Sequence, residues 1–175
     1  MKILVTRTDR LGDLVLSLPV LDYLLAALPE IELHVLVAPG SVPVVECHPG
    51  IKRVWTWEPD DLCVRRDLLR AFRLENFQAA LMLQYHQQLA SLIKKAGIPR
   101  RCGPLSRFSS WFQLNRGVRQ KRSRCQHHEM EYNLQLARKI LPGAPDPGEP
   151  VIRLSEGQRE NGRRFRQEEA AEAET

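Results

Sequence analysis

The sequence predicts an α/β domain of the Rossmann-like, doubly wound class, in which helices cover a parallel β-sheet. Short apolar segments alternate with amphipathic segments at the spacing of β-α units. Several of the apolar segments are continuous enough to be buried on both faces, as parallel strands are. The 175 residues, 43% of them hydrophobic, suffice for one core of ordinary size. We assign residues 1–154 to this domain and residues 155–175 to a charged terminal helix.

The first predicted unit is an apolar strand, Lys2–Arg7, which a polar turn connects to a helical segment. In that segment leucines recur at steps of four and three residues, which is typical of one buried helix face. Pro19 lies inside the segment, and an interior proline removes a helical hydrogen bond. Two alternatives follow: a helix that begins near Ser17, or one that begins near Asp13 and bends.

The later elements continue the alternation of strand and helix. The stretch 104–126 has no clear period, so we expect a loop with one strand there. Asp60 or Asp61 is placed to cap a helix, and Ser155 and Gln158 fit the Ser-x-x-Gln capping box of the terminal helix. The expected strands are Ile31–Ala38, Ile51–Trp57, Phe77–Leu83, Cys102-Gly103 and Val151–Leu154, and the expected helices are Val42–Cys47, Asp61–Leu74, His86–Ala96 and His127–Leu141.

Positive charge is concentrated in one segment. The net charge is +5, but residues 91–126 hold ten basic residues and no acidic ones, while the remainder holds 16 basic and 21 acidic residues. Such a block indicates an anionic partner, either a phosphorylated ligand, an acidic membrane surface or nucleic acid, unless it is only a solvated face. Phe108, Trp111 and Phe112 lie inside it and suit base stacking, insertion among lipid headgroups or burial in the core.

Several classes of protein are excluded by what the sequence lacks. Apolar stretches fall short of the roughly 18 uninterrupted residues of a membrane helix, and no signal-peptide pattern precedes the first strand. We therefore expect a cytoplasmic protein. The four cysteines include no CxxC pair, so we expect free thiols, not disulfides or a zinc knuckle. No Asp-x-Asp pair occurs, and we expect neither a metal nor a bound cofactor. The cysteines are Cys47, Cys63, Cys102 and Cys125.

The turn at residues 6–13 is the strongest candidate for a ligand site. Loops that follow the strands of a doubly wound sheet form its ligand-binding edge. The turn carries neither GxGxxG nor GxxxxGK[ST], which argues against a dinucleotide-dependent oxidoreductase or a P-loop enzyme. Gly12 allows close backbone approach or a positive φ, and the helix dipole stabilises a carboxylate at Asp13. Asp13 is a candidate site residue on this basis, and a plain N-cap is the alternative.

Three motifs carry a resemblance to a known family. Residues 3–19 contain an Arg-x-x-x-hydrophobic-Gly-Asp turn followed by Leu-Pro, residues 96–103 read Ala-Gly-x-x-x-Arg-x-Gly, and residues 128–131 read His-x-hydrophobic-Glu. In this order and spacing they resemble glycosyltransferase family 9, the lipopolysaccharide heptosyltransferases. The resemblance covers residues 2–154.

The resemblance implies an inverting, metal-independent glycosyltransferase of the GT-B type, with two Rossmann-like domains. Residues 1–154 would be its N-terminal, acceptor-binding domain, and residues 155–175 would lead toward a C-terminal, donor-binding domain absent from this sequence. The implied reaction transfers heptose from ADP-heptose to the anionic lipopolysaccharide inner core at the inner-membrane surface. We expect the chain to be truncated and inactive alone.

The family's motifs also assign roles to single residues. Asp13 corresponds to the Gly-Asp aspartate, the family's general base. Arg7 and Arg10 are candidates to pair with acceptor phosphates or carboxylates, although Arg10 is equally explained as a solvated turn residue. The complete set of acceptor-binding candidates is Arg7, Asp9, Arg10, Gly12 and Arg101.

A second hypothesis, in which the protein is not an enzyme, also remains open. The basic block also suits a non-catalytic module that binds anionic lipid or nucleic acid. No nucleic-acid motif accompanies the charge, so we expect no nucleic-acid partner.

Overall fold

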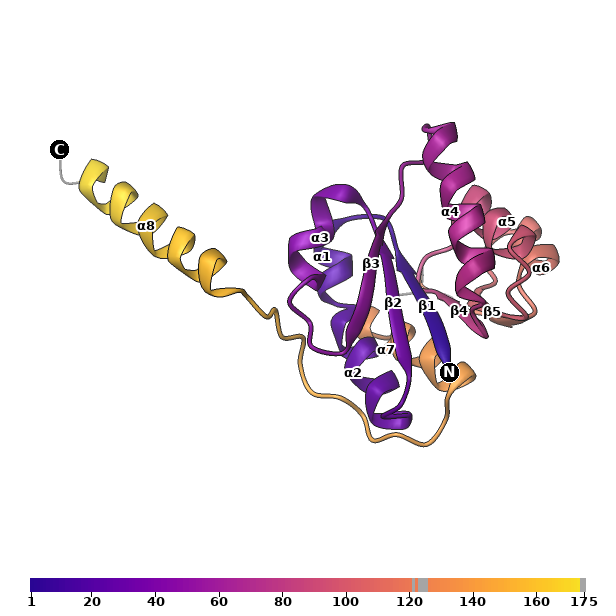
Figure 1. Cartoon of the computed structure of the whole chain (residues 1–175). Helices are drawn as coiled ribbons and strands as arrows, with labels where there is room; N and C mark the ends of the chain where they lie inside the picture. Colours follow the sequence, from indigo (N-terminus) through magenta and orange to yellow (C-terminus); the bar gives the residue numbers. More distant parts are fainter. Residues whose placement is uncertain (121, 123–125, 174–175) are drawn as a thin grey trace.

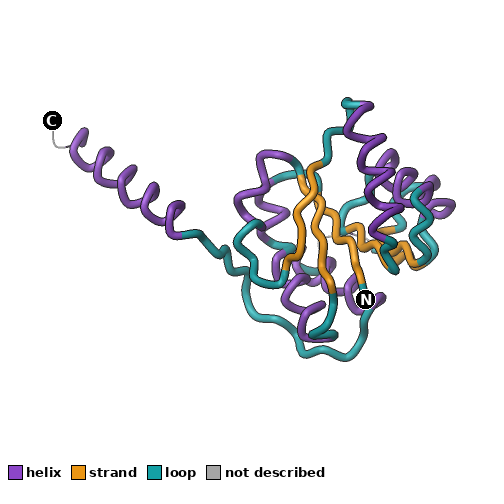
Figure 2. The backbone as a smooth tube through the Cα atoms, in the orientation of Figure 1, coloured by secondary structure: helices purple, strands orange, loops and turns teal. Residues whose placement is uncertain are grey.

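The computed structural model describes residues 1–120, 122 and 126–173, with side chains described up to residue 167. These residues form one six-stranded, all-parallel sheet with the order β3-β2-β1-β4-β5-β6. This is the strand order of a Rossmann fold, and the predicted fold class is confirmed (Figures 1 and 2). The strands are β1 Lys2–Arg7, β2 Glu32–Val37, β3 Ile51–Thr56, β4 Ala79–Met82, β5 Arg100–Pro104 and β6 Arg116–Val118.

Helices cover both faces of the sheet, because successive side chains of each strand point to opposite faces. In β1, Ile3 and Val5 join the core under α1, α2, α3 and α7, whereas Leu4 joins the core under α4 and α5. The helices are α1 Leu11–Val15, α2 Leu18–Ala27, α3 Val42–Val45, α4 Leu62–Glu75, α5 Gln87–Lys95, α6 Phe108–Gln113, α7 Glu129–Ile140 and α8 Glu156–Ala173, with a 3₁₀ turn at Pro39–Ser41.

The proline in the first helical segment divides it into two helices. The short helix α1 ends at Val15, and α2 starts after Ser17 as its N-cap residue. Pro19 therefore lies in the first turn of α2, where its missing N–H has no helical acceptor to lose. Of the two alternatives, the helix that begins near Ser17 is correct, and a separate helical turn precedes it.

The stretch 104–126 contains more structure than predicted. The expected strand is β6, but the helix α6 was missed. The predicted strand Val151–Leu154 is wrong, because these residues pair with no strand and Val151 and Ile152 are 53% and 45% exposed. A short, mostly apolar segment does not make a strand unless a sheet edge lies within reach.

The terminal helix begins as its capping box predicts. The Ser155 N–H donates to Gln158 Oε1 at 2.8 Å, and the Gln158 N–H donates to Ser155 Oγ at 3.2 Å. The Gln158 side chain also donates to Glu46 Oε1. Beyond this contact α8 extends away from the sheet and the other helices (Figure 1).

Three further expectations concern thiols, charge and membrane helices. Cys47, Cys63 and Cys102 are free thiols, as predicted, and Cys125 lies outside the described residues. Within the basic block, Lys121 and Arg124 also lie outside them. Among the described helices, none combines the length and apolarity needed to cross a membrane.

Candidate active site

The candidate site lies where the direction of winding changes, between β1 and β4. These strands are neighbours, but the chain leaves β1 toward β2 and leaves β4 toward β5. Ligands of doubly wound sheets bind outside the carboxyl ends of the strands at this switch point. The loop at residues 8–10 follows β1 there, and α7 packs against β4, β5, β6 and α2.

The centre of the site is the guanidinium group of Arg7, the last residue of β1. Arg7 is 4% exposed. Its Nε donates to Asp9 Oδ1 at 2.6 Å, and its Nη1 donates to Glu129 Oε1 at 3.0 Å and to Asn133 Oδ1 at 3.4 Å. Its Nη2 lies 3.4 Å from Asp13 Oδ2. One buried cation thus gathers carboxylates from the loop, from α1 and from α7.

A second guanidinium group approaches the same carboxylate from the other side. Arg122 Nη1 lies 2.5 Å from Glu129 Oε1, and its Nη2 donates to the Leu83 carbonyl at 3.2 Å, just after β4. Arg122 Nη2 also donates to Asn133 Oδ1 at 3.3 Å. Glu129 and Asn133 therefore bridge the two arginines, and α7 is tied to the ends of both β1 and β4.

The first helices are fixed to α7 by a short hydrogen-bonded chain. Asn133 Nδ2 donates to Ser17 Oγ at 3.1 Å, and Ser17 Oγ donates to the Asp13 carbonyl at 2.7 Å. Ser17 and Asn133 are both buried. The backbone at Asp13 is thus held from α7, in addition to the ion pair of its side chain with Arg7.

Asp13 is the most accessible carboxylate of this group. Its side chain is 34% exposed, against 16% for Asp9 and 24% for Glu129. Asp13 is not an N-cap, because the N-cap of α1 is Arg10, whose side chain makes no capping bond. A carboxylate oriented on one side and open to solvent on the other is suited to accept a proton from a ligand.

The charges of the group do not cancel. Two guanidinium groups, Arg7 and Arg122, face three carboxylates, Asp9, Asp13 and Glu129, so the formal sum is −1. Burial raises the pKa of the Asp9 carboxyl, although Arg7 opposes the shift. Burial lowers the pKa of Arg122, although Glu129 opposes it. The two arginines thus balance Asp9 and Glu129, and the excess charge of −1 is that of Asp13.

The side chains of the remaining predicted residues take no part in this network. Arg10 is exposed and makes no ion pair with a described residue, and a Cβ added at Gly12 would meet open space. Gly12 does not adopt a positive φ. Arg101 lies in β5, opposite Ala80, and its guanidinium donates to the backbone carbonyls of Ile98 and Gln113. The structure therefore brings together Arg7, Asp9 and Asp13, and it places Arg101 in a loop-stabilising position.

Sequence reasoning missed the residues that α7 and its preceding segment contribute. Glu129 stands at the variable position of the His-x-hydrophobic-Glu motif, whose own glutamate is Glu131. Glu129 lies 122 positions from Arg7, and Asn133 lies 126 positions from it. Arg122 was counted only as part of the basic block. The usable signal was the His128 motif itself. His128 caps α7 through its Nδ1, so Glu129 is the first residue of that helix.

A basic pocket opens beside the network. Its volume is about 920 Å³, and Arg107, Arg119 and Arg122 are among the residues that line it. Tyr132 of α7 and Gln84, just after β4, form other parts of its wall. Because Arg122 also pairs with Glu129, the pocket and the carboxylate network share a side chain. A pocket with three arginines is suited to an anionic group.

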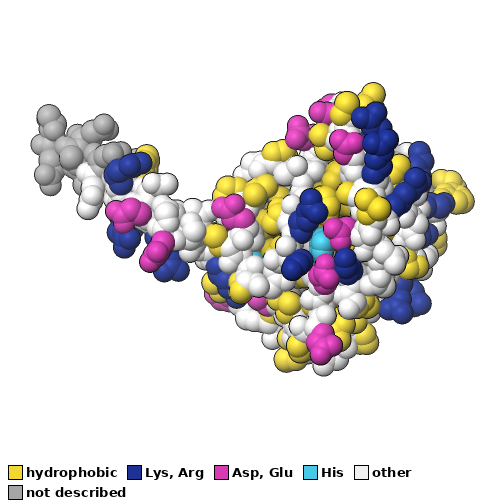
Figure 3. Space-filling view, viewed as in Figure 1, with side chains coloured by type: hydrophobic (Ala, Val, Ile, Leu, Met, Phe, Trp, Pro, Cys, Tyr) yellow, Lys and Arg dark blue, Asp and Glu magenta, His cyan; other side chains and the backbone are white. Residues whose placement is uncertain are grey.

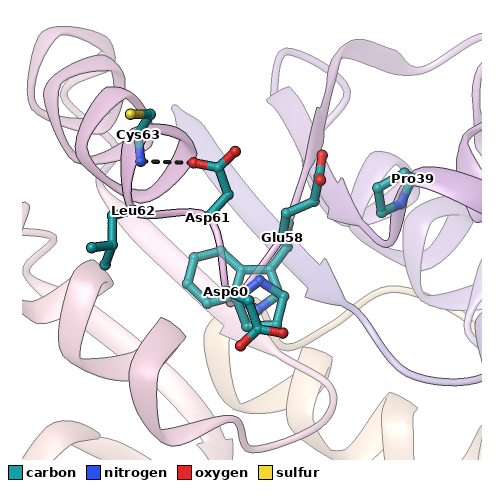
Figure 4. A pocket seen from close by; sticks show the side chains of 8 residues that line it. Pro39, Glu58, Asp60, Asp61, Leu62 and Cys63 are labelled. Atoms are coloured by element: carbon teal, nitrogen blue, oxygen red, sulfur yellow. Dashed lines mark hydrogen bonds between the residues drawn. The ribbon is translucent and has the colours of Figure 1, made fainter.

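A second pocket on the same edge has the opposite charge. It occupies about 730 Å³ beyond the ends of β2 and β3 and is lined by Glu58, Asp60 and Asp61 (Figure 4). Asp61 caps α4, as predicted, by accepting bonds from the N–H groups of Cys63 and Val64. The two pockets therefore differ in charge, and an anionic ligand is favoured in the basic pocket over this one.

One group of potential metal ligands is found among the described residues, at the opposite edge of the sheet. Glu32, His34 and Glu75 place their donor atoms within 4.8 Å of one another. The Lys2 ammonium group lies 3.3 Å from Glu32 and 2.9 Å from Glu75 and already compensates these carboxylates. Trp55 Nε1 donates to His34 Nδ1 at 3.2 Å, which leaves the proton on Nε2, toward Glu32. The cluster is explained as an ion-paired end of the sheet.

Comparison with known sequences gives one curated relative. No protein-family model matches the sequence. A Haemophilus influenzae protein provisionally assigned as a glycosyltransferase is 29% identical over 174 residues, which make up 95% of this chain and 49% of the relative. The chain therefore spans about half the length of the curated relative that it matches.

In the comparison with solved structures, the chain again covers about half the length of the proteins that it matches. A glycosyltransferase family 9 protein from Veillonella parvula superimposes with a TM-score of 0.82 at 18% identity, over 96% of this chain and 49% of that one. The E. coli heptosyltransferase WaaC with ADP gives 0.72 at 24% identity, over 87% and 51%. E. coli ADP-heptose lipopolysaccharide heptosyltransferase II gives 0.73 at 24%, over 90% and 48%. The resemblance to glycosyltransferase family 9 is thus confirmed, and the chain has the Rossmann-like architecture of about half of such a protein.

Proposed function

We propose that the chain is the N-terminal, acceptor-binding half of an inverting GT-B glycosyltransferase, with Asp13 as its general base. The observation that carries the proposal is the Asp13 carboxylate, which is oriented by Arg7 at the switch point of the sheet and is 34% exposed on its open side. Residues 1–154 form the acceptor domain in this proposal, and residues 155–175 lead toward the donor-binding half.

The proposed reaction requires a proton acceptor at this place. The acceptor hydroxyl oxygen attacks the anomeric carbon of the sugar nucleotide, the bond from that carbon to the diphosphate breaks, and the diphosphate leaves with the electron pair. Asp13 takes the hydroxyl proton as the new glycosidic bond forms.

Arg7 is better assigned as a positioning residue than as an acceptor ligand. Its guanidinium is 4% exposed and its nitrogens already face Asp9, Asp13, Glu129 and Asn133. Its effect on the reaction passes through the Asp13 carboxylate. Asp9 in turn holds Arg7 and has a supporting role.

The acceptor subsite is the basic pocket. Its arginines, Arg107, Arg119 and Arg122, suit the phosphates and carboxylates of a lipopolysaccharide-type acceptor. Arg10 and Gly12 stand at the exposed turn beside Asp13, where an acceptor sugar would pass. Arg101 is left out of the subsite because backbone carbonyls occupy its guanidinium.

The donor is ADP-heptose in this proposal, bound by a domain that corresponds to the other half of the structural neighbours. Structures of the neighbour WaaC hold ADP and ADP-2-deoxy-2-fluoro heptose. The product is a heptose linked to the lipopolysaccharide inner core. Neither a metal ion nor a cofactor enters the proposed reaction.

A transfer assay tests the general base. The chain is assayed with a donor-binding domain fused after residue 175, and ADP release from ADP-heptose is followed with an inner-core acceptor. Asp13→Asn should lower kcat by about 10²–10⁴-fold, the usual contribution of general base catalysis. Asp60→Asn, in the acidic pocket, is the matched control and should leave kcat unchanged. Equal rates for Asp13→Asn and the parent would overturn the assignment.

The acceptor subsite has its own test. Arg119→Gln should raise the KM for acceptor about tenfold or more with little change in kcat, because one charge-assisted hydrogen bond is lost. Arg66→Gln, on the exposed face of α4, is the control. An unchanged acceptor KM in Arg119→Gln would remove the basic pocket from the proposal while leaving Asp13 in place.

A further inference from the structure

The helix α6, Phe108–Gln113, has its polarity reversed. Its buried side is polar: Ser110 is fully buried, and the Tyr85 hydroxyl donates to Gln113 Oε1 at 2.9 Å and lies 2.8 Å from the Ser109 hydroxyl oxygen. Its outer side is aromatic. A helix that packs on a protein core places its apolar face inward, so the outward aromatic face of α6 is suited to a different environment.

Three aromatic side chains form that outer face, which we call the aromatic patch. Phe108 is 82% exposed, Phe112 is 64% exposed and Trp111 is 52% exposed. Phe108 and Phe112 contact each other edge to face, with ring centroids 5.2 Å apart. Hydrophobic side chains stand out at the edge of the molecule where α6 lies (Figures 1 and 3). Contiguous exposed aromatics of this kind mark interaction surfaces.

Basic side chains surround the aromatic patch. Arg119 lies over the Trp111 ring, 5.3 Å from its centroid, and Lys94 Nζ donates to the Phe112 carbonyl at 2.9 Å. Arg107 immediately precedes the helix, and Arg116 follows it; both are exposed. The sequence has no acidic residue between positions 91 and 126. The surroundings are therefore cationic, with no carboxylate from this segment to neutralise them.

We propose that the aromatic patch of α6 inserts into the headgroup region of an anionic lipid bilayer, while the surrounding Lys and Arg side chains pair with lipid phosphates. Aromatic rings on one face and cations around them are the two features of an interfacial membrane anchor. Nucleic acid fits less well, because the two phenylalanine rings meet edge to face and leave no parallel stacking platform.

The patch is continuous with the basic pocket. Arg107 and Arg119, which flank the patch, also line that pocket. A lipid-linked acceptor held at the bilayer surface would thus have its anionic groups beside the pocket without leaving the membrane. This inference deepens the proposed function, but its test measures lipid binding alone and involves no sugar transfer.

Vesicle binding by the full chain is the test. The chain is mixed with phosphatidylcholine vesicles that contain about one-third phosphatidylglycerol or none, and bound protein is measured by flotation. We expect binding to the anionic vesicles, weakened by salt, and about tenfold less binding for the double variant Phe108→Ser, Phe112→Ser. Leu74→Ser is the matched control, because Leu74 is 86% exposed on α4 outside the patch.

Tryptophan fluorescence supplies an independent measurement of depth. The chain has three tryptophans, of which Trp55 and Trp57 are buried and Trp111 is exposed. Anionic vesicles should shift the Trp111 emission to shorter wavelength, and lipids brominated on the acyl chain should quench it. Trp111→Phe should abolish both signals and keep vesicle binding. Far-ultraviolet circular dichroism verifies that each variant is folded.

Several results would overturn the inference. These are absence of binding to anionic vesicles, equal binding by the double variant and the Leu74→Ser control, or binding without quenching by brominated lipid. Dimerisation that the double variant abolishes, without vesicle binding, would assign the patch to a second copy of the chain instead. Tight association with DNA that survives the double variant would assign the basic residues to nucleic acid. A failed transfer assay with normal vesicle binding would count against the proposed function only.

Discussion

The Arg7 guanidinium and the Asp13 carboxylate lie 3.4 Å apart, across the turn that joins the first strand to the first helix. The arginine is almost fully buried and the aspartate is one-third exposed. The buried member fixes the orientation of the accessible one, and it is itself fixed by α7 through Glu129. A flexible surface turn is thereby converted into a defined carboxylate site.

Removing the buried cation should destabilise the fold. Arg7→Met leaves Asp9 and Glu129 partly buried without their shared partner, so we expect the free energy of unfolding to fall by about 3–5 kcal/mol. Urea denaturation measures the change. Arg163→Met is the control, since Arg163 forms an exposed pair with Glu160 on α8 and should change stability little. Similar losses in both variants would contradict the central position of Arg7.

Replacing Arg7 by lysine separates positioning from stability. A lysine keeps the charge but lacks the planar fork that reaches Asp9, Asp13 and Glu129 at once. In the fused enzyme, Arg7→Lys should lower kcat about 10–100-fold through misplacement of Asp13, with the acceptor KM nearly unchanged. Should KM rise while kcat stays constant, Arg7 would be an acceptor ligand after all.

Glu129 should matter more than its neighbour Glu131. Glu129 Oε1 is shared by Arg7 and Arg122, whereas Glu131 pairs with Arg138 near the surface. Glu129→Gln should cost about 1–3 kcal/mol of stability, and Glu131→Gln about 1 kcal/mol or less. Thermal and chemical denaturation of the two variants give the comparison. The reverse order would show that the bridge between the two arginines is not formed in solution.

Stability should decrease as the pH falls through the ordinary pKa of histidine. Burial lowers the pKa of His48, with Arg153 lowering it further and Asp22 opposing, so the unfolded chain binds the proton more strongly than the folded chain. The stabilisation is therefore present above pH about 6.5 and is lost below it. In addition, His48 Nδ1 accepts the Gly50 N–H at 3.3 Å, which a protonated ring cannot do.

His86 should also make stability decrease as the pH falls, so a variant of His48 is needed to separate the two contributions. Burial lowers the pKa of His86, helped by Arg107 and Arg65, and His86 Nδ1 caps α5 through the Leu89 N–H. His48→Gln should reduce the loss of unfolding free energy between pH 7.5 and pH 5.5, a range of about one unit either side of the histidine pKa. A pH dependence as steep as that of the parent chain would exclude His48 as a source.

The cysteines should differ sharply in reactivity. Burial raises the pKa of the Cys102 thiol to about 12, and the side chain donates to the Leu136 carbonyl. Cys63 is exposed at the start of α4. Cys63 should therefore react with a thiol reagent in the native protein and Cys102 only after unfolding. Mass spectrometry of the labelled peptides identifies which thiols react, and Cys63→Ser is the control. Labelling of Cys102 in the native protein would contradict the expected difference in reactivity.

Most of the fold could be predicted from periodicity, because strands buried on both faces and amphipathic helices leave clear patterns. The patterns failed where burial did not follow apolarity. In α6 the serines are inside and the aromatics outside, so no inward stripe marks the helix. The mostly apolar segment Val151–Leu154 has no strand edge to join, because the path of the chain, and not the local composition, decides whether an edge is within reach.

The candidate site divides in the same way. Asp13 and Arg7 lie in one local motif and could be selected from it. Arg122, Glu129 and Asn133 could not, because their relation to Arg7 exists only after β4, β5 and β6 have placed α7 across the sheet. Arg101 was selected through its motif, yet its side chain secures a loop at the other end of its strand.

The bonds from Asn133 to Ser17 and from Glu129 to Arg7 span 116 and 122 residues of sequence. An N-terminal fragment that ends before α7 would contain the whole Gly-Asp turn, yet it would lack the groups that orient the aspartate. During synthesis on the ribosome, the Gly-Asp turn would be made early, whereas the contacts from α7 that orient Asp13 would form late. In the proposed function, Asp13 is therefore oriented to act as the base only once nearly the entire sheet has formed.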